Sequence, residues 1–218
     1  LWNIARFISS FPKPVEKVSL RALDEATIAY LNNVLMKIDQ AYSELDVYEP
    51  TNMIYQFTWN YFASHYIELV KNRAYNVQSK YSEEEQIAAW YTLHYVLDRV
   101  LRALAPVMPF ITDAIYERLY GESVHEKRFP EPEPEWVNRD YSLALLIMDV
   151  NSAIWSYKKK RNMKFSEPIH EKVYLPVKLE NVLKEIADLH HLLNVEFYED
   201  KPPENALHIG GSVYIATG

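Results

Sequence analysis

The sequence predicts a mainly α-helical protein, an antiparallel helix bundle followed by a small α+β appendage. Residues 1–120 contain no glycine, and their apolar residues recur every three or four positions, as on one face of a helix. Beyond residue 164, short β-rich runs replace this rhythm. We therefore divide the chain into a bundle, residues 1–138, and a long helix plus small α+β subdomain, residues 139–218.

The bundle begins with three helical segments. The chain opens at once in a short helix over residues 1–7, and the apolar rhythm predicts a second over 23–45 and a third over 50–75. Pro50 suits the first turn of the third helix, where its missing N–H is harmless. The aromatic residues that follow this rhythm are expected to be core residues; they are Trp59, Phe62, Tyr66 and Trp90.

Two further helices carry clear boundary signals. Ser82 is followed three residues later by a glutamate, a capping-box pattern that predicts a helix start. The rhythm continues to about residue 104, where Pro106 ends or kinks the helix. A short helix over 110–120 should end at Gly121, because glycine readily takes the left-handed conformation that closes a helix.

The rest of the chain changes character. A loop with three prolines among acidic residues should be extended and exposed. A long helix follows, and then segments of mixed type, with a glycine pair as a turn before the last strand. The expected ranges are the loop 122–138, helices 140–161 and 179–191, and strands 172–177, 195–198 and 212–216.

The charge distribution is uneven. The net charge of −7 argues against a general nucleic-acid-binding protein. The acidic excess, however, lies in residues 1–150, and residues 151–166 contain no acid. The cations of this acid-free stretch are candidate phosphate contacts, or else a solvated helix end that complements the helix dipole. They are Lys158, Lys159, Lys160, Arg161 and Lys164.

Signals of catalysis are missing from the sequence. It has no phosphate loop, no HExxH and no cysteine, so we expect no catalytic residue, metal site or cofactor. His190 and His191 are adjacent and would point about 100° apart on a helix, which prevents them from sharing a metal easily. No stretch is long and apolar enough to span a membrane. The lack of cysteine fits a reducing compartment, and we expect a cytoplasmic protein.

Three motifs carry a family resemblance. They are LWNIARF over residues 1–7, FTWN with YIELVK over 57–60 and 66–71, and PVMPFITD over 106–113. In this order they resemble the anticodon-binding bundle of class I aminoacyl-tRNA synthetases, most closely the archaeal valyl type. Ala105, Asp113 and Tyr116 stand where that family commonly has His, Glu and Trp. The resemblance covers residues 1–136 well, and beyond them only the block 150–169.

The resemblance implies a function for the whole protein. Such an enzyme attaches valine to its tRNA, and its catalytic domain uses ATP with magnesium for this reaction. The ATP-binding HIGH-like and KMSKS-like segments are missing here, and residues 208–211, which read HIGG, are expected to be a turn. The chain is therefore read as an inactive fragment without a cofactor of its own. Its expected partners are valine tRNA and the catalytic and editing domains of the same protein, not a membrane. Two alternatives stay open, the same region of an isoleucyl or other sister synthetase and a helical protein-interaction module without RNA binding.

The resemblance also points to the residues that read the anticodon. Unpaired bases are recognised by stacking on aromatic rings and by hydrogen bonds to their edges, and arginine can do both. The opening helix and the loop after it offer such groups, and the competing interpretation is that Trp2 and Phe7 are core and Arg6 pairs with an acid. The candidate base contacts are Asn3, Arg6, Phe7, Phe11 and Lys13.

Overall fold

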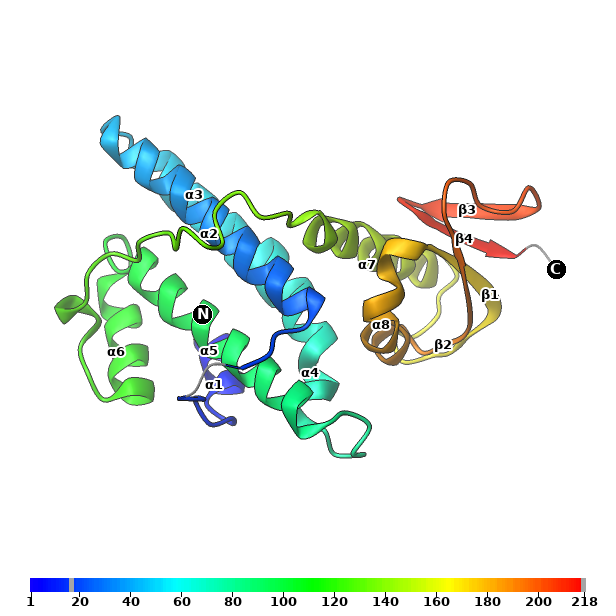
Figure 1. The fold of residues 1–218 in the computed structure, drawn as a ribbon, viewed down its shortest axis with the longest axis horizontal. Helices are drawn as coiled ribbons and strands as arrows, with labels where there is room; N and C mark the ends of the chain where they lie inside the picture. Colours follow the sequence, from blue (N-terminus) through cyan, green and yellow to red (C-terminus); the bar gives the residue numbers. More distant parts are fainter. Residues whose placement is uncertain (16–17, 217–218) are drawn as a thin grey trace.

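The computed structural model describes residues 1–15 and 18–216. A helical lobe and a smaller α+β lobe lie side by side, and α7 (Ser142–Lys160) runs between them (Figure 1). The predicted fold class is confirmed. The domain boundary at residue 138/139 stays a prediction, because α7 packs on α2 of the helical lobe as well as on β3 of the other.

The helical lobe is built around two long helices, α2 (Ala22–Ser43) and α5 (Glu83–Leu104), which pack on each other. The short helices α1 (Trp2–Ile8) and α6 (Pro109–Tyr120) both pack on α5. A 3-10 turn, η2 (Val124–Glu126), follows α6. These bounds agree with the sequence predictions to within a few residues.

The two predicted boundary signals form as expected. Ser82 caps α5: its Oγ accepts from the backbone N–H of Glu85, and Glu85 returns a carboxylate oxygen to the N–H of Ser82 at 2.8 Å. Gly121 follows α6 with φ +75°, the left-handed conformation that glycine adopts without strain. Both helix ends are therefore encoded by a few neighbouring residues.

One predicted helix is interrupted by a wider one. The segment expected as a single helix over 50–75 consists of α3 (Tyr48–Tyr55), a π-helix η1 (Gln56–Tyr66) and α4 (Ile67–Tyr75). Phe57 and Phe62, five residues apart, stack with ring centroids 6.3 Å apart. In an α-helix these two rings would point about 140° apart, so the wider turn is what lets them stack in the core.

The α+β lobe contains a four-stranded mixed sheet in the order β2-β1-β4-β3. Strands β1 (Ile169–Pro176) and β2 (Leu192–Tyr198) are parallel, and the 3-10 turn η3 (Val177–Val182) and α8 (Leu183–His190) connect them. Strands β3 (Ala206–Gly210) and β4 (Val213–Ala216) form an antiparallel hairpin. The sequence prediction missed β3 and expected helix where η3 lies.

The hairpin turn lies against α7. A Cβ on Gly211 would collide with the Asp149 carboxylate, which accepts from the backbone N–H of Ser212 at 2.9 Å. Gly211 also has φ +49°, so both space and conformation require glycine there. The HIGG stretch at residues 208–211 was expected to be a turn, but residues 208–210 belong to β3 and only Gly211 lies in the turn that contacts α7.

Buried charges tie the two lobes together. Arg73 of α4 and Asp24 of α2 are both fully buried, and their closest contact is 2.5 Å. Glu185 of α8, also fully buried, lies 3.7 Å from Nε of Arg73 and 3.4 Å from Nε of Arg21. The smaller lobe therefore contributes a charge to the ionic cluster of the helical lobe.

Candidate nucleic-acid interface

The candidate Arg6 lies in a groove between α1 and α6. The groove has a volume of about 410 Å³, and Trp2 (45% exposed) and Arg118 line it together with Arg6. Within the described residues neither Arg6 nor Arg118 forms an ion pair, so the alternative that Arg6 pairs with an acid is not what the structure shows. Asn3 is exposed on the same helix but does not line the groove.

The two phenylalanines of this corner belong to the core. Phe11 is only 7% exposed, and its ring centroid lies 5.1 Å from Phe7, 5.0 Å from Tyr75 and 6.2 Å from Trp90. The predicted base contact by Phe11 is therefore wrong, because no face of its ring is free. Phe7 is half-buried in the same cluster, edge-to-face with Phe11 and Tyr75, as its alternative interpretation expected.

Lys13 is exposed and lies beside an aromatic ring and a set of paired charges. Its Nζ is 4.6 Å from the centroid of the Tyr120 ring, a cation–π geometry. It also lines a cavity of about 250 Å³ together with Asp98, Glu133 and Arg99, and Arg99 is ion-paired with both carboxylates. The base contact predicted for Lys13 stays a prediction.

Lys158 corrects the predicted cluster of phosphate contacts. Its side chain is fully buried, and Nζ donates to the backbone carbonyls of Phe165, Glu167 and His190 at 2.8, 2.6 and 2.8 Å. Burial lowers the pKa of this ammonium group. Because all three N–H bonds are directed inward, Lys158 has none left for a phosphate.

The other four cations of the cluster remain at the surface. Arg161 is exposed but is engaged, with Nη1 3.0 Å from Glu171 and its guanidinium 4.6 Å from the centroid of the Tyr157 ring. Lys159, Lys160 and Lys164 are exposed and form no ion pair with any residue that the structure describes. These three lysines are the remaining candidates for phosphate contact.

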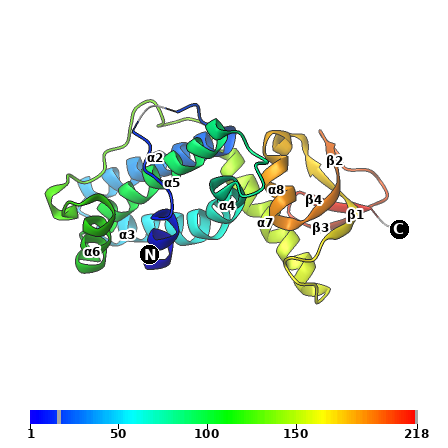
Figure 2. The same cartoon turned by 90° about the horizontal axis from the view of Figure 1, so that it is seen from below.

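The two candidate surfaces belong to different parts of the chain. In Figure 2, α1 and the end of α7 both lie at the lower edge of the view. Sequence reasoning missed Trp2 and Arg118 as groove residues, and no sequence signal could have found Arg118, because only the packing of α6 on α1 and α5 brings it to the groove.

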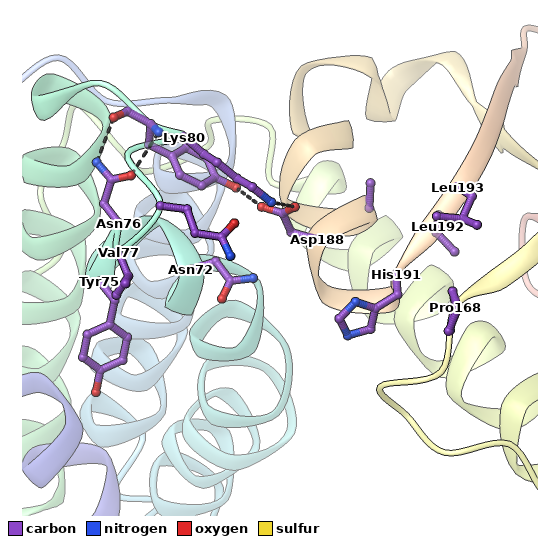
Figure 3. Close-up of a pocket in the computed structure, with 13 residues that line it drawn as sticks. Asn72, Tyr75, Asn76, Val77, Lys80, Pro168, Asp188, His191, Leu192 and Leu193 are labelled. Carbon is purple, nitrogen blue, oxygen red and sulfur yellow. Dashed lines mark hydrogen bonds and ion pairs between the residues drawn. The ribbon is translucent and has the colours of Figure 1, made fainter.

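A larger cleft lies elsewhere and contains none of the predicted site residues. It has a volume of about 680 Å³ and separates the α4–α5 loop from α8 and β2 (Figure 3). Lys80 reaches across it to Asp188 at 3.1 Å, and the hydroxyl of Tyr81 donates to the same carboxylate. These bonds join the lobes across the cleft.

The two adjacent histidines have separate surroundings. His190 is buried, and its Nε2 lies 2.8 Å from the side-chain oxygen of Asn151, whereas His191 is exposed and ends α8 with φ +55°. Among residues 1–15 and 18–216, no group of three His, Asp or Glu side chains lies together in a way that could hold a metal ion. Over the same residues, no helix combines the length and the apolarity needed to cross a membrane.

Arg6 and Arg118 lie beside the exposed Trp2 ring and form no ion pair within the described residues. A helical bundle with such a groove and a separate basic loop fits a nucleic-acid-binding module. Comparison with known proteins gives the family. The chain belongs to the anticodon-binding domains of tRNA ligases, because the model of that family matches residues 24–175.

Individual relatives agree with this family. The chain is 45% identical to the valine–tRNA ligase of Aeropyrum pernix over 98% of its own length and 27% of the relative's. It is 42% identical to that of Pyrobaculum aerophilum, over 89% of this chain and 24% of the relative. It is 34% identical to the valine–tRNA ligase of Methanothrix thermoacetophila, over 83% of this chain and 20% of the relative. The chain thus spans about a quarter of the length of these relatives.

Proposed function

We propose that this chain is the anticodon-side, tRNA-holding part of a valine–tRNA ligase. The observation that carries the proposal is the match of an anticodon-binding family over residues 24–175. Each of the three relatives described above is a valine–tRNA ligase, which favours valine over the isoleucyl alternative. The acidic net charge, the best support for a protein-interaction module, is offset by the local groups at α1 and at the end of α7.

The proposal gives the two surfaces separate tasks. At the α1–α6 groove, the Trp2 ring would stack on an unpaired base and Arg6 would donate to its edge, which provides sequence discrimination. At the end of α7, Lys159, Lys160 and Lys164 would neutralise phosphates and hold the tRNA regardless of its sequence. The resemblance to anticodon domains supports this division.

Valine activation would take place outside this chain. ATP, magnesium and the editing of mischarged tRNA would belong to the catalytic and editing domains of the intact ligase. No residue assigned to these surfaces provides a nucleophile, a base or a metal ligand for that chemistry. The chain by itself is proposed to be inactive.

Three measurements test the proposal. The intact ligase should charge tRNA with valine far faster than with isoleucine, and preferential isoleucine charging would move the chain to the sister family. The isolated chain should give no valine-dependent pyrophosphate exchange. An intact protein that binds no tRNA at any salt concentration would leave the protein-interaction module as the surviving interpretation.

A further inference from the structure

We propose that Lys158 positions the loop over residues 161–168 so that Phe165 presents its ring as a stacking surface for an unpaired base of the bound tRNA. The inference rests on the proposed function and extends it to two residues, one buried and one exposed. The loop follows α7, and its end projects beyond the rest of the α+β lobe (Figure 2).

The three bonds of Lys158 fix the loop from inside. Two of its carbonyl acceptors, those of Phe165 and Glu167, belong to the loop itself, and the third belongs to His190 at the end of α8. The ammonium group thus holds the loop against a helix that is distant in sequence. An ammonium group has three N–H bonds and a neutral amine two, so all three contacts need the charged form.

The loop carries further bonds of its own. The backbone N–H of Met163 donates to the carbonyl of Lys158 at 2.9 Å, and Asn162 takes the left-handed conformation with φ +55°. The backbone N–H of Glu167 donates to the carbonyl of Lys164 at 3.0 Å, while the Glu167 carboxylate accepts from the N–H of Lys164 at 3.3 Å. The segment is therefore a closed turn.

The backbone of Phe165 faces the inside of this turn, and its side chain faces the outside. Its carbonyl faces the buried ammonium group, whereas its side chain is 60% exposed. Within the described residues its ring makes no aromatic pair, although many other rings of the chain do. An exposed phenyl ring forgoes the stabilisation of burial, which a ligand that covers it would supply.

The surroundings of the ring match a single-stranded nucleic acid. Proteins that hold unpaired strands combine an aromatic stacking surface with cations that follow the backbone. Phe165 has Lys164 as its neighbour and Lys159 and Lys160 on the preceding helix end, and these lysines are exposed and make no ion pair within the described residues. The one carboxylate of the turn, Glu167, is engaged with a backbone N–H. A lipid surface would also accept cations and a ring, but membrane-binding segments bury the whole apolar face of a helix, not one side chain.

The first test uses the exposed residue, whose replacement leaves the turn intact. Phe165→Ala in the intact ligase should weaken binding of valine tRNA by about 5- to 150-fold without changing the salt dependence, because stacking involves no ion release. Phe165→Trp should bind at least as well as the unaltered enzyme. Leu193→Ala, another exposed apolar side chain of the same lobe, is the matched control and should change nothing.

The second test addresses Lys158 through a double-mutant cycle. Lys158→Met should weaken tRNA binding as much as Phe165→Ala does, and the double variant should be no weaker than either single one, because both substitutions act on the same stacking interaction. If Lys158 were only a stabilising residue, the two effects would multiply. Should Lys158→Met fail to fold, the Ala and Trp variants of Phe165 still decide whether the ring contacts RNA.

The outcomes separate this inference from the proposed function. If the unaltered ligase binds no tRNA, the proposed function fails, and this inference fails with it. If it binds tRNA and Phe165→Ala binds equally well, only the inference is overturned. Loss of binding to vesicles containing one-third phosphatidylserine, with tRNA binding unchanged, would assign the ring to a membrane surface and also overturn it.

Discussion

Arg73 and Asp24 form a two-point ion pair inside the helical lobe. Both terminal nitrogens of the guanidinium donate to the two carboxylate oxygens, at 2.8 and 2.5 Å, and both side chains are fully buried. The hydroxyl of Tyr66 donates to the same carboxylate at 2.7 Å. The pair joins α4 to the first turn of α2, so the packing of three segments of the bundle depends on one carboxylate.

Asp24→Asn should therefore destabilise the chain severely. It leaves the buried guanidinium of Arg73 without a full counter-charge, which costs about 3–5 kcal/mol in comparable buried pairs. Denaturant unfolding of the chain measures the loss. Glu68→Gln, in the half-exposed pair with Lys71, is the control and should cost no more than about 1 kcal/mol. Equal effects at the two sites would contradict this account of the buried pair.

Glu185→Gln should behave differently although Glu185 is equally buried. Neither of its carboxylate oxygens accepts a hydrogen bond within the described residues. Arg73 is already paired with Asp24, and Arg21 already contacts Glu85, so Glu185 is the third acid beside two cations. Removing its charge balances the cluster, and we expect a loss below about 1 kcal/mol or a gain. A loss as large as that of Asp24→Asn would show that Glu185 is an essential partner.

Acid should weaken the junction of the two lobes at His190. Burial, with repulsion from Lys158, His191 and His65, lowers the pKa of His190 to about 3. In the unfolded chain the pKa of a histidine is about 6.5. Below that pH the unfolded state therefore binds a proton that the folded state does not bind. Stability is therefore lost as the pH falls from about 6.5 towards 3, by about 1.4 kcal/mol per pH unit for this one group.

Urea unfolding of His190→Gln between pH 7 and 4 checks this prediction. The amide of Gln can still donate towards Asn151 but does not titrate. We expect the variant to lose stability less steeply than the unaltered chain over this interval. If the free energy of unfolding falls equally steeply with pH in both proteins, other groups cause the acid sensitivity. Candidates are His65 and His94, because burial also lowers their pKa values.

Salt dependence should locate the phosphate contacts on the exposed lysines alone. Replacing Lys159, Lys160 and Lys164 by Gln should weaken binding of all tRNAs alike and flatten the log–log salt slope by up to about 3, because each lysine would neutralise one phosphate. Three exposed lysines elsewhere, Lys37, Lys178 and Lys201, make the matched triple control. An unchanged slope would show that the basic loop is only a solvated helix end.

Local signals in the sequence predicted local structure well. The capping pattern at Ser82 and the glycine at residue 121 depend on neighbours a few residues away, and both form as expected. The π-helix could not be predicted in this way, because the spacing of its aromatic residues also fits an α-helix for most of its length. Strand β3 was missed because its five residues contain an interior histidine and end on a glycine.

The candidate site shows the same limit more sharply. Lys158 looks like its neighbours in sequence, and only its position opposite three carbonyls from two other segments makes it a buried residue. Phe11 similarly follows an exposed-looking loop pattern yet packs on Tyr75 and Trp90. Arg6 was predicted from the resemblance, but its groove partner Arg118 depends on how α6 packs.

Arg6 provides the most direct test of the central claim that this chain reads the anticodon. The measurement is kcat/KM for aminoacylation by the intact ligase, with valine tRNA and with the same tRNA carrying an altered anticodon, together with the melting temperature. Arg6→Ala should remove about 1–3 kcal/mol of discrimination between the two tRNAs, by analogy with bidentate base contacts, and Arg6→Lys should restore only part of it. Amino-acid activation and the melting temperature should stay unchanged. A lowered melting temperature with undiminished anticodon discrimination would contradict the account and make Arg6 a structural residue of the bundle.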